Sequence, residues 1–218
     1  MSSNKETKID SPGTALLASI ESNEVVGIAS DVVEVGLDSL LDEGVLRDLP
    51  IFGWLAGLSK TFGSVRDALF ARKVVHFLNQ LPSLTEEQRL QTLAKLKAND
   101  KPERIGQTII SFLERSENEN KPGIFGRLWC ALARNEISET EFWTLCNVVD
   151  RCPPNCLREF SEFLTAEDER HTNQSFGYIC VTAGFGDFQP RVNGLSFHCD
   201  DRLAKKLSSI IRQELSDS

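Results

Sequence analysis

Apolar residues recur every three or four positions along most of the chain, and this spacing predicts a mainly α-helical protein. Glycine, proline and helix-capping residues separate the apolar stretches, so short helices packed as a bundle are expected. Two capping boxes are predicted, from Ser83 to Glu86 and from Ser138 to Glu141. In each, the serine would start a helix and the glutamate would bind back to its backbone amide.

Residues 14–48 are predicted to form one long amphipathic helix, after a polar tail at residues 1–13 that is expected to be disordered. Five carboxylates fall on one stripe of this helix: Glu24, Asp31, Glu34, Asp38 and Asp42. Like charges four residues apart repel each other, so a basic partner surface would stabilise this acidic stripe. Runs of charge usually face water, however, so a stripe that faces only solvent is the preferred interpretation and a basic partner is the alternative.

Residues 49–58 form an almost uncharged block that contains Phe52 and Trp54, and such a block is expected to be buried. It could be buried in the core, against a partner or against a membrane, and its two glycines are spaced as in closely packed helices. The apolar positions of the segment that follows drift around the helix, which favours packing inside a bundle over lying on a membrane. Residues 49–137 are therefore expected to form a central helical bundle.

Residues 138–218 are expected to form a C-terminal module of different character. A helix closed by Gly184 is followed by a predicted β-hairpin at residues 185–197, with Asn193 and Gly194 as its turn, and by a last helix capped by Asp200 or Asp201. This order of helix, hairpin and helix gives the module a winged-helix-like end. The helix that would enter DNA in such a fold carries no lysine or arginine, so protein contact is favoured over nucleic-acid binding.

The net charge of −8 is spread unevenly, so that the chain is acidic, then basic, then acidic again. The N-terminal residues carry no apolar export signal, and the six cysteines are therefore expected to be reduced thiols. These features predict a cytoplasmic protein, with peripheral contact to the inner membrane as an alternative. No apolar run approaches the roughly 20 residues that span a bilayer as a helix.

The sequence carries no complete catalytic, phosphate-binding or metal signature, so no cofactor and no metal are predicted. Cys152, Cys156, His198 and Cys199 have the chemistry of zinc ligands, but their spacing is not that of a typical zinc site. Whether these four side chains approach one another is left open. A cysteine nucleophile paired with a distant histidine remains a further alternative.

Three short motifs carry a family resemblance: Phe77-Leu78, Glu87-Gln88-Arg89 and Ile137-Ser138-x-x-Glu141-Phe142. Through them the segment from Phe70 to Cys152 resembles uncharacterised bacterial helical proteins of stress or phage-defence loci, and distantly resembles tellurite-resistance-type helical domains. The resemblance implies a helical fold and a setting in stress response or antiviral defence. It implies no site residues.

Taken together, the sequence predicts a non-enzymatic, cytoplasmic protein-interaction module that binds another protein or associates with itself. Its candidate contact surface comprises Phe52, Trp54 and the acidic stripe. One alternative is a membrane-associated effector that inserts residues 49–81, and another is an unrecognised cysteine-dependent enzyme.

Overall fold

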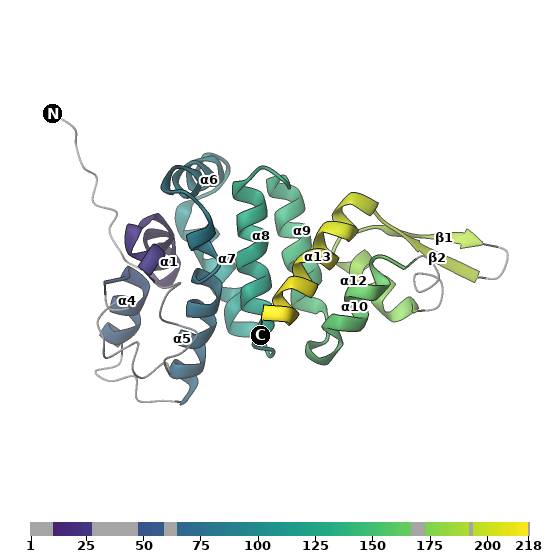
Figure 1. Ribbon diagram of the computed structural model, residues 1–218, viewed down its shortest axis with the longest axis horizontal. Coiled ribbons are helices and arrows are strands. Elements are labelled where there is room, and N and C mark those ends of the chain that lie inside the picture. The colour runs from purple at the N-terminus through teal and green to yellow at the C-terminus, as the bar shows by residue number, and fades with distance from the viewer. Residues whose placement is uncertain (1–10, 28–47, 59–64, 167–172, 192–193, 218) are drawn as a thin grey trace. The chain divides into compact units, whose positions relative to one another are not determined.

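The computed structural model describes the chain at residues 11–27, 48–58, 65–166, 173–191 and 194–217. The described residues are mainly helical and contain a two-stranded antiparallel hairpin near the C-terminus, which confirms the predicted fold class (Figure 1). Contacts divide the chain into two units, Met1–Arg115 and Ser116–Ser218. The sequence predicts a boundary after residue 137, which is one helix later than the division after Arg115. The helix between the two positions, Asn120–Ala133, packs on elements of the second unit.

The first unit is built around helix α1, which packs against α4, α6 and α7. Gly13 of α1 meets Gly106 of α7 so closely that a Cβ on Gly106 would lie 2.1 Å from the carbonyl oxygen of Gly13. Glycine at both positions is therefore what lets these two backbones touch. The elements are α1 (Pro12–Glu21), η1 (Asn23–Gly27), α4 (Pro50–Leu58), α5 (Val65–Leu78), η2 (Leu81–Ser83), α6 (Glu86–Asn99) and α7 (Pro102–Arg115).

The helix expected over residues 14–48 ends at Glu21, which corrects that prediction. The backbone turns extended at Ser22, and the guanidinium of Arg89 donates to the carbonyl oxygens of Ile20 and Ser22 at 3.1 and 3.3 Å. These contacts satisfy carbonyl groups that a longer helix would have bonded itself. Residues 1–10 and 28–47 lie outside the described residues.

One of the two predicted capping boxes is confirmed and the other lies two residues too early. Ser138 accepts from the amide of Glu141 at 3.3 Å, and the Glu141 carboxylate accepts from the Ser138 amide at 2.6 Å. The Ser83 hydroxyl instead donates to the backbone carbonyl of Gln80, just before the 3₁₀ turn η2, and α6 is capped by Thr85. The turn around Pro82 delays the start of α6, and the sequence alone does not reveal it.

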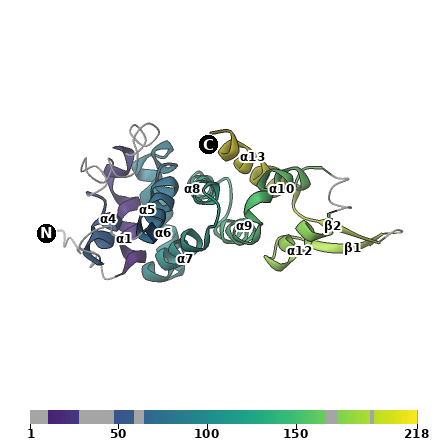
Figure 2. The same ribbon diagram turned by 90° about the horizontal axis from the view of Figure 1, so that it is seen from below.

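The second unit surrounds an aromatic core, and its last helix, α13, packs on α8 and α10 (Figures 1 and 2). Asp200 caps α13 by accepting from the amides of Arg202 and Leu203 at 2.8 and 3.1 Å, as predicted. Core rings come from Trp129, Phe142, Phe160, Phe163, Phe176 and Phe197. The elements are α8 (Asn120–Ala133), α9 (Glu139–Arg151), η3 (Pro154–Cys156), α10 (Leu157–Phe163), α12 (Gln174–Thr182), β1 (Asp187–Arg191), β2 (Gly194–His198) and α13 (Asp201–Asp217).

Candidate interaction surface

The first half of the block at residues 49–58 enters the core of the first unit, through Leu49, Ile51 and Phe52. Phe52 is only 1% exposed, so it belongs to the interior and not to the contact surface in which the sequence placed it. The amide of Ile51 donates to the hydroxyl of Ser19 at 2.9 Å, which ties the start of α4 to α1. Trp54 is half-buried, and a Cβ on Gly53 would meet nothing within 4 Å, so Gly53 does not mark a close helix contact. No helix among the described residues is both long and apolar enough to cross a membrane.

The acidic stripe is represented in the described residues only by Glu24, which is exposed on η1. Asp31, Glu34, Asp38 and Asp42 lie outside the described residues. The stripe therefore stays a prediction.

A different surface emerges at α12, a nine-residue helix without a charged side chain. Asn173 caps its start by accepting from the amide of Phe176 at 3.4 Å. At its end, Gly184 adopts a positive φ of 77°, and the amide of Phe185 returns to the carbonyl oxygen of Cys180 at 2.8 Å. This left-handed helix end directs the chain into the hairpin, and Gly184 closes the helix as predicted.

The hairpin places its apolar side chains on the face that meets α12. Phe188 pairs with Phe197 and Pro190 pairs with Leu195, and cross-strand partners lie on the same face of a sheet. A Cβ on Gly177 of α12 would lie 2.7 Å from the Phe188 ring, so the helix sits directly on this face. The hairpin is thus confirmed, although Gly194 begins strand β2 and is not part of the turn as predicted.

The apolar face of the hairpin continues from the core to the surface. Phe197 is buried, Phe188 is half-buried, and the ring of Tyr178 lies 4.8 Å from that of Phe188 while remaining 53% exposed. Leu195 is 41% exposed and its partner Pro190 is also exposed. We call Tyr178, Phe188, Pro190 and Leu195 the hairpin face.

The sequence around the hairpin face is depleted in charge. About a quarter of all residues in the chain are charged, yet between Asn173 and Phe197 only Asp187 and Arg191 are. Exposed aromatic and aliphatic side chains with few charges are typical of the centre of protein interfaces. The charge depletion could have been read from the sequence, whereas the exposure of Tyr178 depends on how α12 packs.

Two thiols of the second unit, Cys146 and Cys152, are made less reactive by burial. Burial raises the pKa of Cys152 to about 12 and raises the pKa of Cys146 well above its ordinary value. A thiol reacts as its thiolate, so both side chains are poor nucleophiles at neutral pH. In the described part of the chain, no three histidine, cysteine or acidic side chains are close enough together to hold a metal ion.

A search of protein-family models, curated proteins and solved structures finds no match for this chain. The resemblance of residues 70–152 to bacterial helical proteins of stress or phage-defence loci thus stays a prediction. The function has to be inferred from the residues themselves.

Proposed function

We propose that this protein is a non-enzymatic interaction module whose hairpin face binds an uncharged, largely apolar surface of a partner protein. The observation that carries the proposal is the exposure of Tyr178 and Leu195 on a face almost free of charge. Burying such side chains on binding is favourable in proportion to the apolar area removed from water. Tyrosine is also among the residues that most often dominate binding energy.

The chemistry of the buried thiols supports a role in binding rather than catalysis. Burial holds Cys146 and Cys152 in their protonated form, so neither is a ready nucleophile at neutral pH. The six cysteines form no disulfide among the described residues, as the proposed cytoplasmic location requires. The partner could belong to a bacterial stress or defence system, as the resemblance implies.

Site-specific photocrosslinking in the source cells tests the proposal. A photoreactive phenylalanine analogue replaces Tyr178 or Leu195, and the control carries the same analogue at Arg151, which is exposed on α9. We expect one discrete adduct from both hairpin-face positions and none from position 151. An adduct containing a second copy of the chain would identify self-association as the form of binding.

Substitutions at the same face supply the complementary test. Tyr178→Ser and Leu195→Ser should abolish the adduct formed from the other position, because each removes part of the apolar contact. The proposal fails if no discrete adduct forms at either position. It also fails if the yield at position 151 equals that at 178 and 195.

A further inference from the structure

A hollow of about 490 Å³ lies on the second unit along α13 and the end of α10. Its lining is made of cationic, hydroxyl and amide side chains, and no carboxylate of the described residues contributes to it. Residues 167–172, which follow in the chain, lie outside the described residues. The hollow is shallow and open to solvent, and Lys205, Ser209, Arg212 and Gln213 are all exposed, so it could hold the charged group of a molecule but would not enclose the whole molecule.

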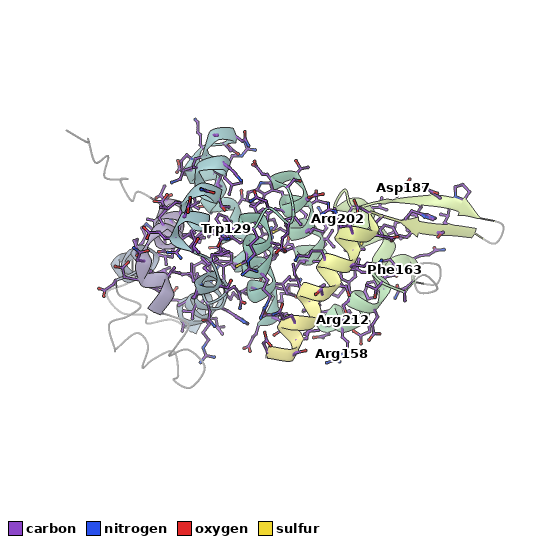
Figure 3. All side chains as sticks on the ribbon, turned by 45° about the horizontal axis from the view of Figure 1, so that its top comes forward. Trp129, Arg158, Phe163, Asp187, Arg202 and Arg212 are labelled. Atoms are coloured by element: carbon purple, nitrogen blue, oxygen red, sulfur yellow. The ribbon has the colours of Figure 1, made fainter. Side chains whose placement is uncertain are left out.

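The two cations of the hollow are Lys205 and Arg212, seven residues apart on α13. Figure 3 labels Arg212 on this helix. Seven residues correspond to almost two turns of an α-helix, so both side chains project from the same side about 10 Å apart along the axis. Ser208 and Ser209 lie between them and Gln213 follows. Two long cationic side chains can therefore reach a common anionic group.

Arg212 is held in place by hydroxyl groups and not by a carboxylate of the described residues. Its Nε donates to the hydroxyl of Ser161 at 3.4 Å, and its Nη2 donates to the hydroxyl of Thr165 at 3.2 Å. Ser161 is itself fixed, because its hydroxyl donates to the carbonyl oxygen of Arg158 at 2.7 Å. These contacts orient the guanidinium, and the hydroxyl groups do not neutralise its charge.

Other cations of the same unit are engaged differently. Arg127 binds Glu214 and Asp217 at 2.7 and 2.5 Å, Arg202 binds Glu141, and Lys206 binds Glu136. These ion pairs connect α13 to α8 and to the start of α9. Lys205, by contrast, has no carboxylate within ion-pair distance among the described residues, although it neighbours Lys206.

We propose that this hollow binds the phosphate or diphosphate group of a small organic molecule. Phosphate oxygens accept several hydrogen bonds at once, and an oriented guanidinium, an ammonium, a serine hydroxyl and an amide are the donors that suit them. The donors would be Arg212, Lys205, Ser209 and Gln213. The inference is independent of the hairpin face, because none of its residues belongs to that face.

Titration of the full chain with inorganic pyrophosphate tests the inference, using NMR or calorimetry at constant ionic strength. We expect saturable binding with a Kd below about 1 mM, raised at least tenfold in Lys205→Gln and further in Lys205→Gln/Arg212→Gln. Arg212→Lys keeps the charge but loses the planar fork, and an intermediate affinity is expected. Arg151→Gln makes the same charge change on α9 and should bind as the unmodified protein does.

Three results would overturn the inference. One is the absence of saturation with pyrophosphate, and a second is equal weakening by Arg151→Gln, which would indicate a general effect of charge. The third is equally tight binding of citrate, which would make the hollow a site for any polyvalent anion. Arg212 also contacts Ser161 and Thr165, so its replacement can affect folding. If thermal unfolding shows that the Arg212 variants are unfolded, the affinity of Lys205→Gln for pyrophosphate alone tests the inference.

Discussion

Replacing Arg89 should lower the free energy of unfolding more than most other single substitutions in the first unit. It is 1% exposed and carries a charge, yet its partners are carbonyl and amide oxygens: the carbonyls of Ile20, Ser22 and Leu84, and the side chain of Asn23. Burial lowers the pKa of its guanidinium, although arginine stays protonated at neutral pH. Arg89 thus fixes the end of α1 from a helix far away in sequence.

The magnitude follows from the groups that Arg89→Met would leave without a donor. The contacts to Ile20 and Leu84 are buried, and each unpaired buried carbonyl costs about 1–3 kcal/mol. The contacts to Ser22 and Asn23 are only partly buried, so water can replace the guanidinium there. Methionine also removes the cost of burying a charge, which offsets part of the loss. A net decrease of about 2–4 kcal/mol in the free energy of unfolding is expected.

Lys97→Met provides the matched control, because Lys97 also lies on α6 and also reaches the end of α1. It pairs with Glu21, and both side chains are about 30% exposed. Pairs that exposed contribute about 0–1 kcal/mol, so this variant should unfold almost as the unmodified protein does. Urea unfolding followed by circular dichroism measures both free energies, and hydrogen exchange at residues 19–25 locates the change. Equal effects of the two variants would refute the view that buried hydrogen bonds of Arg89 hold this helix end.

Three further predictions concern other parts of the chain. At pH ~8, a thiol reagent should modify Cys152 far more slowly than the half-buried Cys156, because a pKa of about 12 leaves only ~10⁻⁴ of the Cys152 thiol ionised. Peptide mapping after labelling measures both rates, and similar rates would contradict the prediction. The hydrogen bond from the Ser138 amide lowers the pKa of Glu141, so the Glu141 carboxylate stabilises the fold above pH about 4.5 and this stabilisation is lost as the pH falls. Between pH ~5 and ~3, the free energy of unfolding should therefore decrease less in Glu141→Gln than in the unmodified protein. Gly106→Ala should lower the free energy of unfolding by roughly 1–3 kcal/mol, because the new Cβ would clash with the backbone of Gly13. Gly53→Ala faces open space and should raise the free energy of unfolding by up to about 1 kcal/mol. The opposite order of stabilities would show that α1 and α7 do not touch at these glycines.

Local patterns in the sequence predicted elements well wherever the deciding contacts are local. The capping box at Ser138 and the helix end at Gly184 involve neighbours within a few residues, and both were read correctly. The end of α1 depends on Arg89, which is 67 residues from Ser22 in the chain. The helical spacing of apolar residues therefore predicted a helix that continues beyond the observed end of α1. Long-range hydrogen bonds of this kind leave no periodic pattern.

The candidate surface was harder to predict than the fold, for a related reason. An uncharged stretch indicates burial, but it does not say whether the covering group belongs to the same chain. At Phe52 the cover is the chain's own core, whereas at Tyr178 more than half of the side chain stays exposed. Both stretches look alike in composition, and only packing separates them.

Leu195 allows the contact face to be separated from the needs of folding. A two-stranded hairpin is only marginally stable alone and needs one packed face, which Phe197 supplies against α12. Leu195 lies on the same face but is 41% exposed, so Leu195→Ser should change the free energy of unfolding by less than about 0.5 kcal/mol.

Phe197→Ala, at a position that is 1% exposed, should cost about 3–5 kcal/mol in the same urea titration. If Leu195→Ser instead costs more than about 1.5 kcal/mol, Leu195 is needed for folding and its apolar side chain requires no partner to explain it. If the cost is as small as expected, folding does not account for an exposed leucine beside Tyr178 on an uncharged face. Loss of the crosslinked adduct in Leu195→Ser would then reflect loss of the proposed contact and not loss of folding.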